Sequence, residues 1–459
     1  MSGRGLGYGV SAFVLAAVVI AGAVVIDHGL GVRAPAAAPS SSTDSGAWLC
    51  PHGGGAGWEG RLYLANPGNV LATVRVTSMS RKTSSVVRTV KVDPGTTMEV
   101  DVPATAKEAS TYVEYFGGWV AAGWVTVASS AEGTGVSAEP CAAATDALTW
   151  YTANGGTPKG AGASVIIMNP YGVSAIFDVV LFATDRAPVY ETNLTGVVLK
   201  PHRSMVVPIQ TILPLEAAVG SEIDVHAGRV AVAAVDTSVQ HGVSAVLGST
   251  SPTSSLTVPV LAGTGQRSVS MMVPGADGIR FDGSTLGEGA SQPTGGLSDV
   301  AQAPQTTQSY TVATSGASAL RLVEQQGSSG SFVASVGSLG EGSDVAATAG
   351  AVAGSRWIVL PTVAGDPATP GLVITNPGTE GASVSLHVLS ADGPRDVTLD
   401  VSAGSSIAAP SSFLGAAGEA GILVTATTGR VIAAGASGSL GMHGVAGYAI
   451  AVGVAAPNP

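Results

Sequence analysis

A tryptophan followed by an apolar strand that ends in Asn-Pro occurs three times in this 459-residue chain. The three copies are Trp48 with Asn66 and Pro67, Trp150 with Asn169 and Pro170, and Trp357 with Asn376 and Pro377. From tryptophan to asparagine the residue numbers differ by 18, 19 and 19, so the spacing is nearly constant. A motif that recurs at one internal spacing indicates repeated structural units, and this constrains the architecture more than any single segment does.

The residue types in this repeat have a structural explanation. Proline cannot donate a backbone hydrogen bond to a neighbouring strand, so it ends the strand. Asparagine bonds its own backbone and closes a turn at that end. Tryptophan buries a large apolar area and is best explained as a core anchor. We therefore interpret these residues as markers of the fold, with a ligand contact by the asparagines as the less favoured alternative.

Between the markers, short segments alternate apolar and polar residues, as half-buried strands do. In residues 97–102, for example, Met98, Val100 and Val102 share one side. Markers and turns divide the chain into four modules, at residues 47–144, 145–253, 254–354 and 355–459. We expect an all-β protein of tandem antiparallel β-sandwiches that resemble immunoglobulin or fibronectin type III domains. A β-propeller is the alternative, in which each module supplies two blades.

The third stretch, residues 254–354, lacks the Trp and Asn-Pro markers. Val273 stands where the asparagine is expected, followed by Pro274. The alternating Val and Leu residues of this stretch favour a degenerate module over a linker. Residues 283–309 are rich in Gly, Ser, Gln, Thr and Pro, and we expect a long mobile loop there.

The N-terminal segment predicts export. Residues 10–26 are apolar, and the uncharged span that contains them is about long enough to cross a bilayer as one helix. This favours an uncleaved signal anchor, with residues 1–9 in the cytoplasm and the bulk of the chain outside. Residues 27–46 have the composition of an Ala/Pro/Ser spacer. Cleavage of the segment, which would make the protein freely secreted, is the alternative.

The chain has two cysteines, Cys50 and Cys141, and they bracket the first module. An even pair in an exported chain predicts a disulfide. Closing a loop of this length stabilises a fold by up to about 4–5 kcal/mol in the chain-entropy account.

Charge and motifs exclude several function classes. Acidic residues outnumber basic ones, the net charge is -11, and no basic run offers the phosphate-neutralising surface that nucleic-acid binding needs. No His-Glu-x-x-His zinc motif and no Gly-x-Ser-x-Gly nucleophile motif is present. Glu132 and Glu139 flank a loop, but nothing distinguishes them as an acid/base pair. We expect no cofactor and no metal, and rank a hydrolase below non-enzymatic functions.

Aromatic residues concentrate in the first module. Tyr112, Tyr115, Trp119 and Trp124 lie in two neighbouring segments there, and we regard them as candidate sugar-stacking residues. The alternative, which we favour, is that they fill the core.

With the repeats, the signal anchor and the spacer together, the chain resembles an uncharacterised family of exported or membrane-anchored actinobacterial proteins, a domain of unknown function. The resemblance implies a cell-envelope location and no catalytic residues. We therefore expect a non-enzymatic, membrane-anchored extracytoplasmic protein that acts as a scaffold or interaction array, with envelope glycans or proteins as partners. The alternative is a protein that binds cell-wall or capsule glycan through module 1.

Overall fold

Alternation of apolar and polar residues produces strands with one buried face along the whole described chain. In β30 (Ala382–Leu389), for instance, Ala382, Val384 and Leu386 are buried, whereas Ser383 and Ser385 between them are partly exposed. The computed structural model describes residues 45–130, 133–238, 242–260, 266–314, 316–339, 348–362, 371–393, 395–414, 420–438 and 448–457. Residues Thr43–Pro459 form one compact unit.

The strands fall into four consecutive groups, which we call modules 1 to 4. Module 1 contains β1 (Ser45–Pro51), β2 (Trp58–Asn66), β3 (Ala72–Met79), β4 (Ser84–Val92), β5 (Thr96–Val102), β6 (Ser110–Phe116), β7 (Ala121–Ser130), β8 (Gly133–Pro140) and β9 (Ala142–Ala143). Module 2 contains β10 (Thr149–Thr152), β11 (Ala161–Asn169), β12 (Ala175–Ala183), β13 (Val189–Tyr190), η1 (Thr192–Leu194), β14 (Val197–Leu199), β15 (Arg203–Pro208), α2 (Ile209–Ile212), β16 (Val219–Ala227), β17 (Ala231–Ser238) and β18 (Gly242–Leu247).

The second half of the chain follows the same plan. Module 3 contains β19 (Ser255–Pro259), β20 (Gln266–Val273), β21 (Ile279–Gly287), β22 (Gln292–Pro293), β23 (Val300–Gln302), β24 (Thr306–Ala313), β25 (Ala317–Glu324), β26 (Val333–Leu339) and β27 (Thr348–Ala349). Module 4 contains β28 (Arg356–Thr362), β29 (Leu372–Asn376), β30, β31 (Asp396–Val401), β32 (Ser405–Ala408), α3 (Ser411–Leu414), β33 (Ala420–Thr428), β34 (Ile432–Gly438), β35 (Tyr448–Val452) and β36 (Val454–Ala455).

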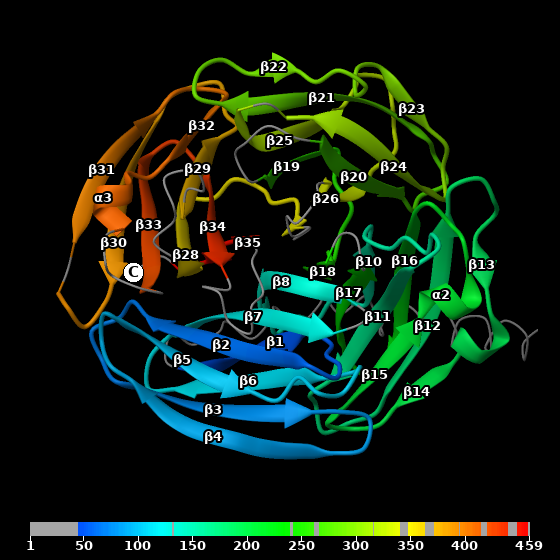
Figure 1. Ribbon diagram of the computed structural model, residues 1–459, viewed down its shortest axis with the longest axis horizontal. Coiled ribbons are helices and arrows are strands. Elements are labelled where there is room, and N and C mark those ends of the chain that lie inside the picture. Colours follow the sequence, from blue (N-terminus) through cyan, green and yellow to red (C-terminus); the bar gives the residue numbers. More distant parts are fainter. Residues whose placement is uncertain are drawn as a thin grey trace, which may run out of the picture. The chain divides into compact units, whose positions relative to one another are not determined.

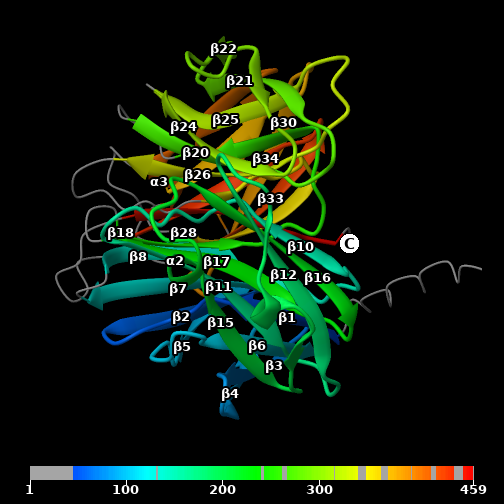
Figure 2. The same cartoon turned by 90° about the vertical axis from the view of Figure 1, so that its right-hand side faces the viewer.

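Each module has two antiparallel sheets with one common strand order. In module 1 the orders are β4-β3-β6-β1-β9 and β5-β2-β7-β8, and in module 4 they are β31-β30-β33-β28-β36 and β32-β29-β34-β35. Figure 2 shows module 2 from the side, where β12 and β16 belong to one sheet and β11 and β17 to the other. The chain therefore crosses several times between the two sheets of a module, and in module 1 only β3–β4 and β7–β8 are consecutive strands of one sheet. The propeller alternative does not predict this order.

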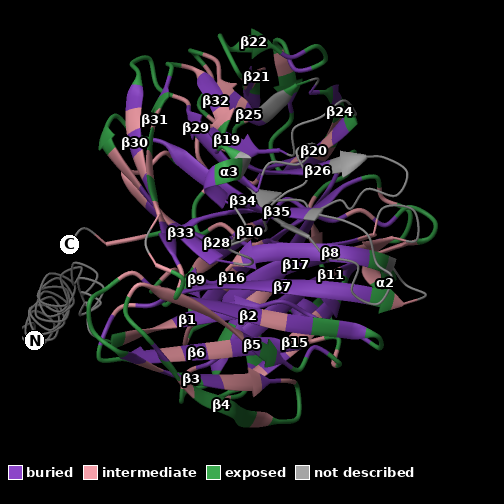
Figure 3. Cartoon of the chain, turned by 60° about the vertical axis from the view of Figure 1, so that its left-hand side comes forward, coloured by how far each residue is buried: buried purple, intermediate pink, exposed green. Residues whose placement is uncertain are grey.

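The two sheets of a module share a core. The buried cluster of module 2 combines residues from both sheets, including Trp150 and Phe177 from one and Ile167 and Val232 from the other. Figure 3 shows the buried residues as purple segments along the strands of the unit. Burying the inner faces of paired sheets is the main apolar stabilisation that a domain of this kind has.

The expectation of a long loop at residues 283–309 is wrong. These residues hold the end of β21, all of β22 and β23, and the start of β24, and β23 pairs with β21. Module 3 is therefore built like its neighbours. The Gly, Ser and Thr residues of this stretch alternate in strands or close short turns, and composition alone does not distinguish such short strands from a loop.

The strand-end asparagines (Asn66, Asn169 and Asn376) tie two sheets together. The side-chain amide of Asn169 donates to the carbonyls of Val173 (2.8 Å), Leu199 (3.1 Å) and Lys200 (3.3 Å), while its Oδ1 accepts from Tyr171 N. Asn66 and Asn376 make the corresponding bonds, to Val70 and Val92 and to Glu380 and Val401. The asparagine thus closes a turn and also holds the end of the other sheet, which explains why it recurs.

In module 3, the donor of the hydrogen bond that joins the two sheets comes from the other sheet. Val273 pairs with Thr306, as Asn169 pairs with Arg203, so it occupies the asparagine position. Gln302 precedes Thr306 by four residues, as Leu199 precedes Arg203, and its Nε2 donates to Met271 O (3.0 Å). In module 3 the donor side chain therefore lies on β23 instead of at the end of β20, and the hydrogen bond between the two sheets is still made.

This exchange predicts a rescue experiment. Gln302→Leu is expected to lower the free energy of unfolding by about 2 kcal/mol, because it leaves a buried carbonyl without its donor. Adding Val273→Asn is expected to recover at least half of that loss by restoring the arrangement of the other modules. Urea denaturation followed by tryptophan fluorescence measures both changes; no recovery in the double variant would contradict the equivalence of the two positions.

The tryptophan markers lie in the core at the first strand of their modules. Trp48 Nε1 donates to Val120 O (2.6 Å) and Trp357 Nε1 to Val431 O (2.8 Å). Trp150 is equally buried, but its Nε1 has no hydrogen-bond partner among the described residues. The strand register places Leu256 at this position in module 3, so an apolar side chain of another shape fills the same site.

The four modules pack in a closed cycle within the unit Thr43–Pro459. One apolar cluster joins module 1 to both module 2 and module 4, and a second joins module 2 to module 3. β32 of module 4 lies against β21 and β25 of module 3. Figure 1 shows β8, β18 and β35 close together at the centre of the unit, where β8 contacts the other two.

Polar contacts close the cycle between the first and last modules. Thr97 Oγ1 of module 1 donates to Leu389 O (3.0 Å) and accepts from Gly421 N (2.9 Å), both in module 4. On the other side of module 1, Ala245 N of module 2 donates to Ser137 Oγ (2.7 Å). Module 1 is thus held to both of its neighbours by directional bonds as well as by apolar packing.

The predicted membrane segment at residues 10–26 and nearly all of the spacer lie outside the described residues. Within the part of the chain that the structure describes, no helix has the length and apolar character needed to span a bilayer.

Candidate functional site

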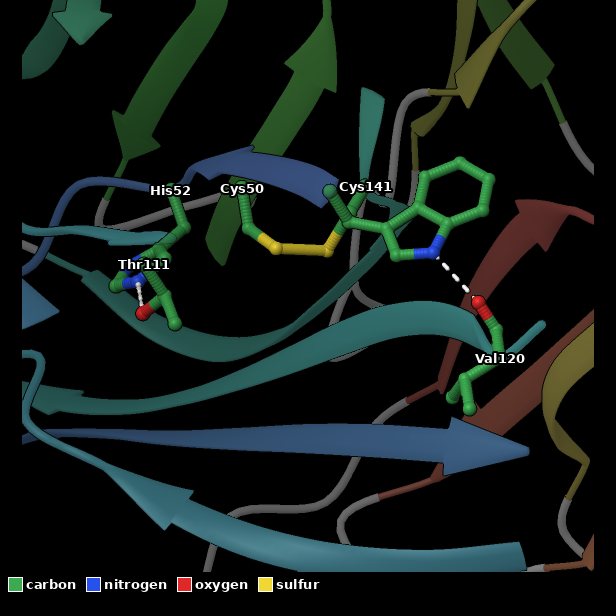
Figure 4. Close-up of a disulfide and its surroundings, with 6 residues drawn as sticks. Cys50, His52, Thr111, Val120 and Cys141 are labelled. Carbon is green, nitrogen blue, oxygen red and sulfur yellow. Dashed lines mark hydrogen bonds between the residues drawn. A yellow bond between two sulfur atoms is a disulfide. The ribbon is translucent and has the colours of Figure 1, made fainter. Parts of the chain in front are cut away.

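The predicted disulfide is confirmed: Cys50 and Cys141 are bonded, 91 residues apart in sequence (Figure 4). Cys141 N donates to Ala122 O, in the place where Gly248, Gly350 and Gly453 make the same bond in the other modules. A side chain at this position would contact the first strand of its module. In module 2, for example, a Cβ added at Gly248 would lie 3.2 Å from the ring of Trp150. Module 1 uses this proximity for its covalent link.

The candidate sugar-stacking residues of module 1 belong largely to the interior. Tyr115 is 3% exposed and Trp124 is 2% exposed, so neither ring presents a face to a ligand. Trp119 is partly buried and packs edge-on against Trp48, with ring centroids 5.9 Å apart. Tyr112 is partly buried against the core of module 2. Tyr115 and Trp124 are thus core residues, whereas Tyr112 and Trp119 pack at the edge of the core and keep partial exposure.

Next to the disulfide, His52 is fully buried (Figure 4). Its Nε2 lies 2.8 Å from Thr111 Oγ1, and its ring stacks on that of Trp124. Burial lowers the pKa of His52 to about 4, whereas its bond to Gly53 O acts in the opposite direction. The imidazole is therefore neutral at physiological pH and has a structural role.

A polar cavity lies between modules 2 and 3 and has a volume of about 240 Å³. We call it the module 2–3 cavity. Its wall combines hydroxyl, amide and carboxyl side chains with small residues from β17, β18, β20 and β24; its polar side chains include Asn154, Asp236, Ser244, Ser268, Ser270 and Ser309. Asn154 Nδ2 donates to Ser244 Oγ (3.1 Å), and Ser268 Oγ lies 2.8 Å from Ser309 Oγ. Such a wall offers many hydrogen bonds and no aromatic surface.

Asp236 is the carboxylic acid of this cavity. It lies on β17 directly opposite Ser244, and its Oδ1 is enclosed with no hydrogen-bond partner among the described residues. The residue as a whole keeps partial exposure through the cavity. Loss of hydration raises the pKa of Asp236 to about 8, so the group is mainly protonated at neutral pH and both donates and accepts hydrogen bonds.

Asp236 makes the stability of the fold depend on pH. Its pKa is higher in the folded chain than the ordinary value of 3.8, so the folded state holds a proton that the unfolded state releases. The contribution of Asp236 to the free energy of unfolding is therefore fully present below about pH 4 and is lost as pH rises toward 8. We expect a loss of about 1–2 kcal/mol between pH 6 and pH 8, reduced by the partial exposure of the residue. Asp236→Asn is expected to remove this slope in urea titrations; an unchanged slope would contradict the assignment.

A second buried carboxyl, Glu139, lies on β8 away from this cavity. It is 3% exposed, and burial raises its pKa well above the ordinary range, while the Leu247 backbone favours its charged form. Glycoside hydrolysis by the usual route needs two carboxyl groups flanking one bond. Among the described residues, the wall of the module 2–3 cavity supplies Asp236 alone. In the described ranges, no group of three or more His, Cys, Asp or Glu is arranged to hold a metal ion.

Sequence reasoning missed both Asp236 and the cavity. Asp236 directly follows a run of buried apolar residues, Val230 to Val235. An acidic residue at the end of such a run is the sequence feature that could have indicated a buried carboxyl. The serines of β20 belong to another module, so their approach to Asp236 depends on how the modules pack.

Residues 116–337 match a family of unknown function (DUF5719). No curated protein matches the sequence. The matched segment runs from the end of β6 through module 2 and most of module 3, and therefore includes the module 2–3 cavity. This match supports the expected resemblance to a family of unknown function over these residues.

Proposed function

We propose that this chain is a non-enzymatic, membrane-anchored protein of the bacterial cell envelope whose four modules form a rigid interaction platform. The closed cycle of modules carries this proposal. Each module uses two sides to contact its neighbours, so the array keeps one geometry, unlike beads on a flexible linker. The disulfide supports an oxidising, extracytoplasmic location. A closer likeness of the modules to immunoglobulin or fibronectin type III domains belongs to the same proposal.

Exposed apolar side chains support a role in partner binding. Val70, Leu71 and Phe116 of module 1 are between 42% and 49% exposed, and the first two follow the Asn-Pro turn. Val173, at the same place in module 2, is 60% exposed. Apolar groups that stay in water next to one another mark contact surfaces more often than chance.

The mature N-terminus and the cell fraction test the anchor. A chain that starts before residue 10 and sediments with membranes is the expected result. A start near residues 35–40, with the protein in the medium, would contradict the anchor.

Photocrosslinking in intact cells tests the platform. A photoreactive residue at Phe116 (47% exposed) is expected to give a discrete adduct with an envelope component, whereas one at the more exposed Leu215 of module 2 (75%) is not. Identical adduct patterns at the two positions, or none at Phe116, would contradict a contact surface on module 1.

Carbohydrate binding is the second candidate function, and the module 2–3 cavity is the observation that favours it. Hydroxyl and amide groups together with a carboxyl that both donates and accepts suit the hydroxyls of a neutral sugar. The site we propose for it is this cavity, because Tyr115 and Trp124 of module 1 are buried and Tyr112 and Trp119 are only partly exposed.

A glycan array with the full chain separates the two candidates. Ser270→Phe fills the cavity and is expected to abolish sugar binding. Ser385→Phe, at an equally exposed strand position in module 4, is the matched control and is expected to leave binding intact. Absence of sugar binding by the unmodified chain would leave the platform as the proposed function and overturn the glycan proposal.

A further inference from the structure

A second cavity, of about 430 Å³, lies at the junction of modules 1 and 2. Arg81 approaches it from the turn between β3 and β4, and the other lining residues come from β14, β15 and the turn that joins them. We call it the basic pocket; it is lined by Arg81, Val197, Val198, Leu199, Lys200, Arg203, Met205 and Val206. Three of these residues are cations, and none of the described lining residues is acidic.

The three cations have no carboxylate partner among the described residues. Arg203 Nη1 donates to His202 O (2.7 Å), and the carboxylate of Glu108 accepts from the backbone N–H of Arg81 (3.0 Å). Of the five other arginines of modules 1 and 2, four are paired with acids: Arg61 with Glu99, Arg75 with Glu114, Arg186 with Glu216 and Arg229 with Asp146. In a chain with 31 acidic and 20 basic residues, the basic pocket thus brings together three cations whose side chains no described carboxylate pairs with.

Bonds between the modules fix the position of the cations. Ser204, which is fully buried, donates its backbone N–H to Ser80 O (3.2 Å) and its hydroxyl to Glu108 O (2.5 Å). Ser80 also accepts from Thr83 N through its Oγ (3.1 Å), which closes the turn that carries Arg81. The two arginines thus lie on elements bonded to each other across the junction, which lowers the ordering cost of binding a ligand between them.

From this geometry we infer that the basic pocket binds a phosphate ester. The planar guanidinium groups of Arg81 and Arg203 offer paired donors that match phosphate oxygens, and Lys200 adds a third charge. The apolar wall, formed by Val197, Val198, Met205 and Val206, contacts the body of the ester. A charged headgroup and an apolar wall in one cavity select an organic anion over a bare ion.

Calorimetric titration of the full chain in detergent micelles tests this inference, with glycerol phosphate, inorganic phosphate and glycerol as probes. Glycerol phosphate is expected to bind, and neutral glycerol is not. Tighter binding of the ester than of inorganic phosphate supports contact with the apolar wall. Equal or weaker binding of the ester overturns the assignment to an ester.

Substitutions locate the site. Arg81→Gln with Arg203→Gln is expected to weaken glycerol phosphate binding at least tenfold without changing the melting temperature, because both side chains reach solvent. Arg88→Gln, on the exposed edge strand β4, is the charge-matched control and is expected to change affinity less than twofold. No binding by the unmodified chain, or an equal loss in the control, overturns the inference.

Discussion

Replacing both cysteines of module 1 with alanine is expected to lower the free energy of unfolding by about 4 kcal/mol. The bond between Cys50 and Cys141 closes a loop of 91 residues, and opening it restores to the unfolded chain the conformational freedom that the bond removes. The effect is large because the loop includes almost every strand of module 1. Urea denaturation of the oxidised chain and the double variant measures the difference.

Reduction provides the control for this prediction. Dithiothreitol is expected to destabilise the unmodified chain by a similar amount and to leave the double variant unchanged. Equal stability of the oxidised chain and the variant would show that the cross-link contributes nothing to the fold.

Asn169→Ala is expected to lower the free energy of unfolding by about 3 kcal/mol. The substitution removes a buried amide that serves three carbonyls, two of which belong to the other sheet of module 2 or its following turn. A buried polar group that is left without a hydrogen-bond partner costs about 1–3 kcal/mol. We expect a loss at the upper end of this range, because the three carbonyls lose one shared donor. Thermal and urea unfolding both report this change.

Asn193 in η1 is the matched control, because it is an exposed asparagine of the same module. Asn193→Ala is expected to change stability by less than about 0.5 kcal/mol. Comparable effects at the two positions would contradict the role assigned to the strand-end asparagines.

Local patterns in the sequence predict local structure in this chain well. The Asn-Pro turns, the alternating strands and the disulfide depend on residue types and spacings that can be read from short stretches of the sequence. Even in module 3, the sequence alignment that places Val273 at the asparagine position agrees with the strand register.

Features that depend on packing between modules were not predictable in the same way. Gln302 replaces the asparagine from a different strand, and no local pattern relates it to Val273. Asp236 lines a cavity together with residues of module 3, and its burial there raises its pKa. Arg81 and Arg203 line one pocket because Ser204 bonds module 2 to module 1. Among the aromatic residues of module 1 that the sequence offers as sugar contacts, Tyr115 and Trp124 lie in the core, and Tyr112 and Trp119 are partly buried.

The four modules close into a cycle, with module 1 against module 4. A Cβ added at Gly421 would lie 2.8 Å from Thr97 Oγ1, which places cysteines at these positions within reach of a disulfide. The tip of Leu360 must move, and the methyl group of Ala65, 3.3 Å away, must shift slightly.

Oxidation of the full chain carrying Thr97→Cys and Gly421→Cys, followed by mass mapping, tests this closure of the cycle. We expect an intramolecular bond between the two new cysteines in monomeric protein. The control pair Thr97→Cys and Thr428→Cys, which uses the far end of β33, is predicted to give none. Failure of the first pair to bond, or bonding at equal yield in the control, would contradict the closed cycle.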